Sequence, residues 1–502
     1  MQAISNEPGA NEAQLVCTSC KTRKRKCDKA LPKCSPCSKK RLKCEYLQPV
    51  PNGDSTQTDQ PWHSISIVNE SQHNSRAIDF PTMLFLDPTI LQQSQVELYQ
   101  TTFHIPGQIL GYLGDMDDIR NIASKFFTHV HVWMPFISKK RFYEVYLPSY
   151  SKYRPDVTLL FLSLKLLTSS PPRDPQNPQT RLYRAVKHFL VEVEDSTVFS
   201  ILVLQAGVLL ALYELGHGIY PAAFLTIGAC ARYAYALGIK TKTAASTRRV
   251  LTLVEVEERK RVWWALVILD RFVSIGCPGR PFVTEDPTLD DLFPIDDEAW
   301  DKGIVRLEDS FTLSAPKASH MSKFALLCQA ARLLGQVLHH LSSNSVDSHD
   351  AWIQLERTIQ SMLAASLDSE NPDNDQIAFV YSTLVALHTP WLSPGPGMAI
   401  MDAERSNHAR EVIQQILHKV KTNLVEQKCF LARDPDDISP WGLFFAYRLC
   451  VDHIRSGERA SGPDFSEVIK SLKETFVTID ARWNVAGVYL KLLEAQEATS
   501  YF

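Results

Sequence analysis

Six cysteines between residues 17 and 44 follow one spacing that occurs twice. The pattern C-x2-C-x6-C appears in CTSCKTRKRKC and again, seventeen positions later, in CSPCSKKRLKC. Basic residues repeat with the cysteines at three matched pairs of positions: Arg23 and Lys40, Lys24 and Arg41, Lys26 and Lys43. A segment of about thirty residues cannot bury a stabilising hydrophobic core by itself. Any fold of this segment must therefore depend on its cysteines.

Cysteines at this spacing can form disulfides, remain free thiols or bind metal. The N-terminal sequence MQAISNEPGANEAQL has no apolar run that would serve as a secretory signal, so we expect reduced cysteines. Pairs spaced C-x2-C are typical of tetrahedral Zn²⁺ sites. Two such ions need eight sulfur positions, so two of the six thiolates would bridge both ions. We therefore predict two structural Zn²⁺ ions with these ligands: Cys17, Cys20, Cys27, Cys34, Cys37 and Cys44.

The cysteine segment is strongly basic, whereas the rest of the chain is acidic. Residues 17–44 contain eleven Lys or Arg and one acidic residue, although the whole chain has a net charge of -3. A fixed positive surface of this kind favours a polyanionic partner. The run KTRKRK alone could also be a solvated face or a nuclear localisation tract. Beside a metal scaffold that fixes its geometry, the run favours contact with double-stranded DNA.

From roughly residue 95 the chain has the apolar spacing of amphipathic helices. Clear examples are RLYRAVKHFLVEVEDS and VEVEERKRVWWALVILDRFVSIG, and further helices are expected at about 321–340, 350–367 and from 404 onward. The longest apolar stretch, residues 198–213, contains Gln205 and is short for a membrane span, so it indicates a buried core helix. We find no run of alternating strand residues. The sequence predicts an all-α body without a membrane partner.

Two segments interrupt the helical pattern, and both are expected to be loops. One is the proline-rich SSPPRDPQNPQ, and the other is residues 285–301, with eight acidic residues, no basic residue and several large apolar ones. The acidic segment could be an activation surface for a coactivator, but a loop against the helical domain is favoured. Trp263-Trp264 and Asp270-Arg271 are interpreted as structural. Common catalytic motifs are absent beyond an isolated S-x-x-K, so no catalytic residue is predicted.

The cysteine segment resembles the fungal zinc binuclear cluster (Zn2Cys6) family of transcription factors. The resemblance rests on all six cysteines, the basic run before Cys27, Pro32 two residues before Cys34, and Tyr46 two residues after Cys44. It implies that the first and fourth cysteines, Cys17 and Cys34, bridge the two ions. The remaining ligands would then divide into two pairs: Cys20 and Cys27 at one ion, Cys37 and Cys44 at the other.

The same resemblance assigns the DNA contacts. In this family, the residues that contact bases lie three and four positions after the second cysteine, which are Arg23 and Lys24 here. The DNA-binding run would also include Lys21, Arg25 and Lys26. Targets of the family typically contain CGG triplets, and cationic donors match the O6 and N7 acceptors of guanine.

The helical body resembles the family's regulatory middle homology region, through FFTHVHVWMPFISKKRF, LYELGHGIYPAAFLTIGACARYAYALGI and ERKRVWWALVILDRFVSIGCPGRPF. We expect a disordered N-terminus (1–16), a Zn2Cys6 domain with two short helices (17–46), a flexible linker (47–95), an all-α regulatory domain (96–430) and a C-terminal helical segment (431–502). The Gln/Ser/Asn-rich linker has no a/d heptad repeat, so the sequence gives no coiled coil to support homodimerisation.

These features predict a nuclear, sequence-specific DNA-binding transcription factor of the RNA polymerase II type. By resemblance it would control a metabolic pathway, such as a secondary metabolite gene cluster, together with the transcription machinery or coactivators. A zinc-binding adaptor that recruits partners without sequence-specific DNA contacts is the alternative. An α-helical enzyme with an accessory zinc module is less favoured, because the catalytic motifs are missing.

Overall fold

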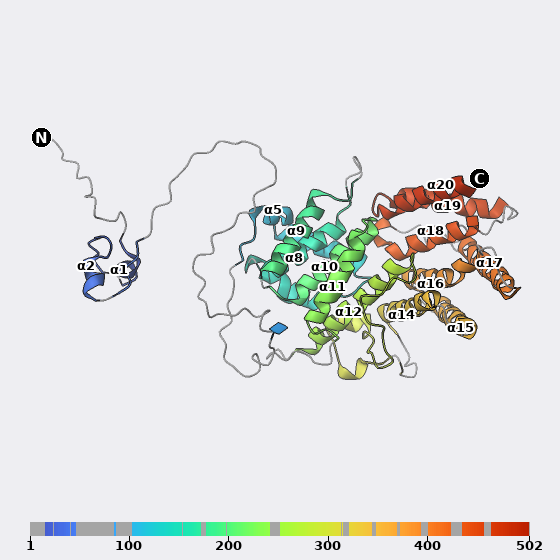
Figure 1. Cartoon of the computed structure of the whole chain (residues 1–502), viewed down its shortest axis with the longest axis horizontal. Coiled ribbons are helices and arrows are strands. Elements are labelled where there is room, and N and C mark those ends of the chain that lie inside the picture. Colours follow the sequence, from blue (N-terminus) through green and yellow to red (C-terminus); the bar gives the residue numbers. More distant parts are fainter. Residues whose placement is uncertain are drawn as a thin grey trace. The chain divides into compact units, whose positions relative to one another are not determined.

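A computed structural model describes residues 16–23, 25–40, 42–46, 85–86, 103–152, 154–171, 177–196, 198–240, 251–312, 314, 321–343, 348–368, 372–392, 400–422, 434–455 and 463–500. They belong to a small unit within Met1–Asn74 and a large unit within Ser75–Phe502 (Figure 1). Apart from isolated β-bridges, the regular structure of these residues is helical, which confirms the predicted fold class. The expected disordered N-terminus and linker lie outside the described residues, except for residues 16 and 85–86.

The small unit contains the two short helices that were predicted, α1 (Thr18–Thr22) and α2 (Ser35–Lys39). Each helix begins directly after a cysteine, and the Sγ of Cys17 accepts a hydrogen bond from the backbone N–H of Cys20 at 3.4 Å. The two ends of the unit meet, because the Thr18 N–H donates to the Glu45 carbonyl at 2.9 Å. The Tyr46 hydroxyl also donates to the Ala30 carbonyl at 2.7 Å. These contacts close the chain around the cysteines.

The first part of the large unit is built around α10 (Ile201–Gly216), whose residues 202–216 are all buried. This confirms the predicted core helix, and none of the described helices has the length and apolarity needed to cross a membrane. Helix α10 packs against α8, α9, α11 and α12. The elements of this part are α5 (Gly107–Leu113), α6 (Met116–Lys125), η1 (Phe126–Val130), α7 (Lys139–Arg141), η2 (Phe142–Tyr146), η3 (Leu147–Lys152), α8 (Pro155–Thr168), α9 (Arg181–Asp195), α11 (Ala222–Ala236), α12 (Leu253–Ser274), α13 (Asp297–Asp301) and η4 (Leu307–Asp309).

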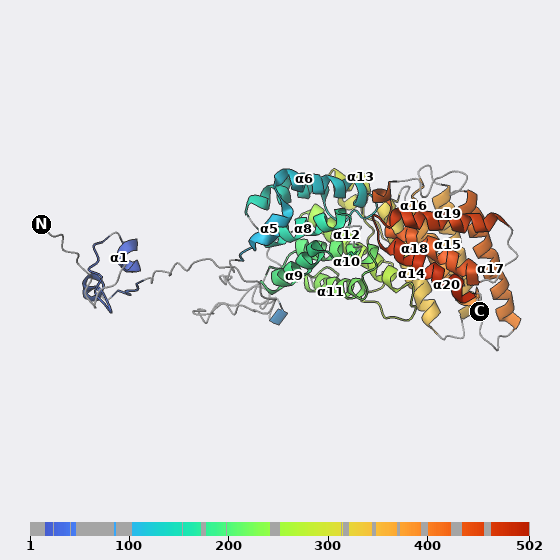
Figure 2. The ribbon, with the colours of Figure 1, turned by 90° about the horizontal axis from the view of Figure 1, so that it is seen from above.

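The second part of the large unit is centred on α16 (Asn374–Leu392), which packs against four other helices, α14, α15, α17 and α18. Figure 2 shows this part at one end of the large unit, with α5 to α12 toward the other end. Its remaining elements are α14 (Lys323–Ser342), α15 (Ser348–Leu367), α17 (Ile400–Lys421), η6 (Pro435–Asp437), α18 (Pro440–Arg455), α19 (Pro463–Ile479) and α20 (Val485–Ser500). Helix α12 packs on α14 and joins the two parts.

The acidic segment at residues 285–301 is a packed part of the large unit. Its Ile295 and Trp300 are fully buried and Phe293 is nearly so. The loop prediction is wrong for Asp297–Asp301, which form the short helix α13. The Asp296 side chain stabilises this helix at its start by accepting from the Ala299 N–H at 2.9 Å. The apolar residues between the acids therefore anchor the segment, as expected of a loop that packs on the helical domain rather than of a free activation surface.

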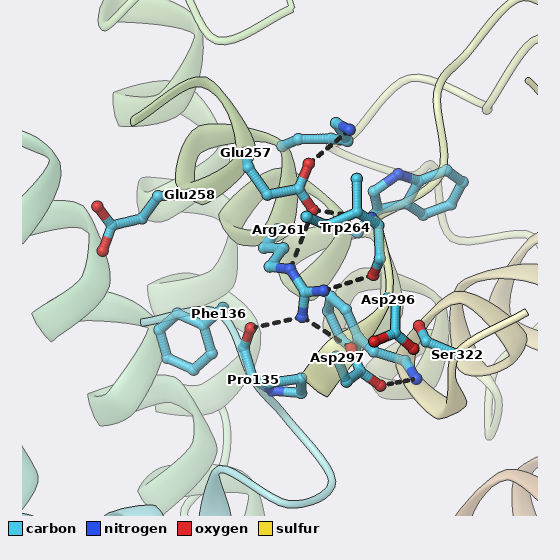
Figure 3. Close-up of polar contacts among 12 residues, drawn as sticks. Pro135, Phe136, Glu257, Glu258, Arg261, Trp264, Asp296, Asp297 and Ser322 are labelled. Carbon is cyan, nitrogen blue, oxygen red and sulfur yellow. Dashed lines mark hydrogen bonds and ion pairs between the residues drawn. The ribbon is translucent and has the colours of Figure 1, made fainter. Parts of the chain in front are cut away.

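Arg261 of α12 joins this segment to the core (Figure 3). Its guanidinium is fully buried and donates to Glu257 Oε1 at 3.0 Å, Asp297 Oδ1 at 2.9 Å, the Pro135 carbonyl at 3.1 Å and the Ile295 carbonyl at 2.7 Å. Buried charges are stable only when they are paired and hydrogen-bonded in this way. One side chain thus connects α12 with two segments far away in the sequence.

Asp270 and Arg271, also on α12, hold the start of the acidic segment in a similar manner. Asp270 Oδ2 accepts from the Thr284 N–H at 2.9 Å, and Arg271 donates to Asp286 Oδ1 at 2.9 Å. Trp263 and Trp264 are buried in the core. The structural interpretation of these four residues is confirmed.

Gly216 provides a test of how the two parts of the large unit fit together. A Cβ at this position would lie 2.3 Å from a ring carbon of Trp483, which is fully buried and donates from Nε1 to the Ile438 carbonyl at 2.8 Å. Gly216→Ala should therefore lower the free energy of unfolding by about 1–3 kcal/mol, as overpacking does. Urea denaturation of the full chain, followed by helical circular dichroism, measures this change.

The matched control is Gly228→Ala within α11, where the nearest neighbour of an added Cβ is Val283 Cγ1 at 3.9 Å. With space available, replacing a helical glycine by alanine should stabilise the chain by about 0.5–1 kcal/mol. Opposite signs for the two substitutions are expected. Equal effects would show that the contact with Trp483 does not limit the packing.

Candidate metal centre and nucleic-acid interface

Four cysteine sulfurs of the small unit lie within 4.8 Å of one another. They come from equivalent places in the two halves, because Cys17 and Cys34 precede α1 and α2 while Cys20 and Cys37 lie within these helices. The Sγ–Sγ distances are 3.7 Å for Cys17–Cys34, Cys17–Cys37 and Cys20–Cys34, and 3.8 Å for Cys20–Cys37. All four side chains are buried.

These distances fit a zinc–thiolate site. Zn–S bonds are about 2.3 Å long, so neighbouring sulfurs of a tetrahedral site lie about 3.8 Å apart. The measured separations of 3.7–3.8 Å match this value and exceed the S–S bond of a disulfide, about 2.05 Å. The donor set therefore has the chemistry and the spacing that Zn²⁺ requires.

The Cys34 sulfur lies near the other five sulfurs of the segment. Cys44 Sγ is 3.7 Å from Cys34 Sγ, and Cys27 Sγ lies within 4.8 Å of it. A thiolate shared by two ions needs such a position, which supports Cys34 as a bridge. The group of four contains Cys20 together with Cys37, whereas the predicted ligand sets separate these two. The division of the ligands between the ions therefore stays a prediction.

Burial affects the protonation of the thiols. It raises the pKa of Cys17 to about 12 and also raises the pKa of Cys20, because a buried thiolate loses its hydration. Metal binding must then displace protons from these sulfurs. Zinc affinity should consequently rise with pH.

The predicted DNA-binding residues Lys21, Arg23, Arg25 and Lys26 are all exposed. None of the four has an acidic partner among the residues that the structure describes. Arg23 directly follows α1 as its C-cap residue, and its backbone N–H donates to the Ser19 carbonyl at 3.3 Å. Lys24 and its counterpart Arg41 lie outside the described residues. The first half of the repeat thus presents cationic donors that are available to a ligand.

The two halves of the repeat differ in a way that the repeated sequence pattern did not predict. Lys43, the counterpart of Lys26, pairs with Glu45 at 2.6 Å. Asp28, the counterpart of Glu45, instead accepts from the Ser35 N–H at the start of α2, with both oxygens at 3.0 Å. The matched positions of Asp28 and Glu45 were visible in the sequence, but their different partners depend on the fold. As a result, Lys26 has no acidic partner among the described residues, whereas its counterpart Lys43 is paired.

Comparisons with known proteins agree with this geometry. Residues 15–53 match the model of the fungal Zn(2)-Cys(6) binuclear cluster domain, and residues 123–377 match that of the fungal specific transcription factor domain. The chain is 35% identical over 178 residues to transcription factor BOA15 of Botryotinia fuckeliana, covering 35% of this chain and 97% of that relative. It is 22% identical over 543 residues to the pigment biosynthesis transcriptional activator pigB of Monascus ruber, covering 98% and 94%. The notoamide biosynthesis cluster transcriptional coactivator notQ' of Aspergillus versicolor is 24% identical over 324 residues, covering 62% and 61%.

Proposed function

Because this chain belongs to the fungal specific transcription factor family and has a Zn(2)-Cys(6) cluster that binds two zinc ions, we propose that the first half of the cluster contacts DNA bases. The observation that supports this most directly is the exposed cationic group at the end of α1, the helix that contains the buried Cys20. In this proposal all six cysteines bind zinc, Arg23 and Lys24 contact guanines, and Lys21, Arg25 and Lys26 contact nearby bases or phosphates. CGG-type triplets are the expected targets.

The second half of the cluster has a different role in this proposal. Its exposed Lys39 and Lys40 contact phosphates, and Lys43 is already paired with Glu45. Phosphate contacts position a protein on the duplex but carry no sequence information. This division follows from the family resemblance, which assigns the base contacts to the first half, and the pairing of Lys43 with Glu45 supports it.

We assign a regulatory role to the large unit. Its charged residues pair with one another in the interior, as Arg261 does with Glu257 and Asp297, and such pairs stabilise the fold rather than supply catalytic groups. The unit would respond to coactivators or other transcription proteins in the nucleus. Relatives named for pigment and notoamide biosynthesis support control of a secondary metabolite pathway. An enzymatic role is not part of the proposal.

Selection of DNA from a random pool by the full-length, zinc-loaded chain tests this function. Enrichment of CGG-containing sites is expected, with one triplet for a monomer and two at fixed spacing for a homodimer. The alternative, a zinc-binding adaptor, predicts retention of DNA without enrichment of any sequence. That outcome would overturn the proposed contacts with bases.

Arg23→Ala tests which half of the cluster contacts bases. Loss of a bidentate contact to guanine should reduce discrimination between the selected site and a scrambled site by about 1–3 kcal/mol. Titration of the variant against both sites at several salt concentrations gives this value.

Lys40→Ala is the matched control, since Lys40 is the counterpart of Arg23 in the repeat. It should weaken binding to both sites by the same factor. It should also make the slope of log affinity against log salt concentration shallower by about one. An equal loss of discrimination in both variants would mean that the two halves contact bases alike.

A further inference from the structure

Three side chains that are far apart in the sequence form a polar group within the second part of the large unit. Glu356 lies on α15, His388 on α16 and His408 on α17. Helix α16 packs against both other helices, and all three lie at the same end of the unit (Figure 1). One oxygen of Glu356 and one nitrogen from each imidazole lie within 4.8 Å of one another. This set of two His and one Glu is unrelated to the cysteine cluster.

His388 is the most unusual member of the group. Its side chain is fully buried, and neither ring nitrogen makes a hydrogen bond within the described residues. Nε2 lies 3.5 Å from Glu356 Oε1, which is beyond a good hydrogen bond but suits two ligands of one ion. Bonds from Zn²⁺ to nitrogen and oxygen are about 2.0–2.2 Å long, so adjacent ligand atoms lie about 3.3–3.5 Å apart. A metal ion would therefore satisfy a nitrogen whose contact with Glu356 is too long for a good hydrogen bond.

The other two members are arranged to complete such a site. His408 Nε2 is 2.7 Å from Glu356 Oε1, and the His408 side chain is 44% exposed, so it has room to open this distance around an ion. Gln360 Nε2 donates to Glu356 Oε1 at 3.0 Å and orients the carboxylate from the next turn of α15. The Glu356 carboxylate therefore faces both imidazoles from α15.

A buried aromatic side chain, Trp352, packs against both imidazoles. The Trp352 ring lies 5.4 Å from that of His388 and 5.7 Å from that of His408, measured between centroids. Trp352 is itself 5% exposed. The Trp352 ring therefore covers part of both imidazoles, whereas the exposed His408 side chain leaves a route from solvent. Hydrophobic surroundings of this kind strengthen the attraction between a cation and a carboxylate.

We propose that Glu356, His388 and His408 form a third zinc site, which joins α15, α16 and α17 in the large unit. Two His and one Glu are a common ligand set for Zn²⁺, and three protein ligands leave one position for water or a residue of a partner. The site makes the stability of the large unit dependent on zinc, independently of the cysteine cluster.

The zinc content of the full-length chain tests the proposal. After loading with Zn²⁺ and dialysis, the chain is expected to retain one zinc ion more than His408→Gln, measured by mass spectrometry of the metal. His408→Cys keeps a ligand at this position and should retain the additional ion. His418→Gln changes another exposed histidine of α17 and should match the unmodified chain. Equal zinc content in the unmodified chain and His408→Gln overturns the proposal and leaves a hydrogen-bonded polar group.

Cobalt substitution separates this site from the cysteine cluster. The absorption difference between the Co²⁺-loaded chain and Co²⁺-loaded His408→Gln should contain d–d bands without sulfur-to-cobalt charge transfer, because the site has no thiolate. A difference spectrum with charge-transfer bands would place the lost ion in the cysteine cluster and also overturn the proposal. As a second measurement, added Zn²⁺ should raise the midpoint of thermal unfolding of the large unit, followed by helical circular dichroism, in the unmodified chain but not in His408→Gln.

Discussion

Removal of zinc by a strong chelator should unfold residues 17–46 and abolish sequence-specific DNA binding, while the helical unit keeps its circular dichroism. The core of the small unit consists of cysteine side chains, with Leu42 and Tyr46 as its other apolar contacts. Zinc binding to such domains contributes about 10–16 kcal/mol, which is folding free energy because the site does not exist in the unfolded chain. DNA titration before and after chelation, with re-addition of Zn²⁺, measures the loss and its recovery.

Cysteine variants test whether the loss of DNA binding comes from the cysteine cluster. Cys34→Ser should remove both ions of the cluster, because all other cluster sulfurs lie near Cys34. Cys277→Ser, at an exposed cysteine of the large unit, should change neither zinc content nor DNA binding. Specific DNA binding by Cys34→Ser, or by the chelated chain, would contradict the dependence of the DNA-contacting surface on metal.

Arg261→Met should lower the free energy of unfolding of the large unit by about 3–5 kcal/mol. The substitution keeps much of the side-chain volume but leaves the buried Glu257 carboxylate with less compensation and releases Asp297 from α12. It also removes the donors to two backbone carbonyls. Urea denaturation followed by circular dichroism gives the change.

Arg120→Met is the control for this prediction. Arg120 pairs with Asp117 at 2.6 Å, but both side chains are more than half exposed, and exposed pairs contribute little to stability. The expected change is within about 0.5 kcal/mol. If the two substitutions had equal effects, the burial of Arg261 would not be the source of its contribution.

The cysteine cluster could be predicted closely from the sequence because its information is local. Six cysteines within 28 residues, repeated at one spacing, were enough to predict two zinc ions. The sequence did not determine how the cations of the two halves differ, because the partners of Asp28 and Glu45 depend on contacts across the unit. The assignment of each cysteine to one ion or both also remains a prediction.

In the large unit, helices with a regular apolar stripe were predictable and sites made by packing were not. The stripe of α9 and the apolar run of α10 each predicted a helix that the structure contains. Helix α16 lacked a prediction of its own, because it is buried almost all round and so has no polar face to give a pattern. Glu356, His388 and His408 have no motif spacing, since three different helices contribute them. Only the packing of these helices brings them together.

The hydrogen bond between the Thr18 N–H and the Glu45 carbonyl has a topological consequence for the zinc unit. The polypeptide enters and leaves this unit at almost the same point, so a protein that accepts it in a surface loop would not need to separate the ends of that loop. Domains with adjacent termini tolerate insertion and circular permutation. The zinc unit is therefore a portable module, whose transfer to another scaffold or relocation within its own chain leaves its internal connections unchanged.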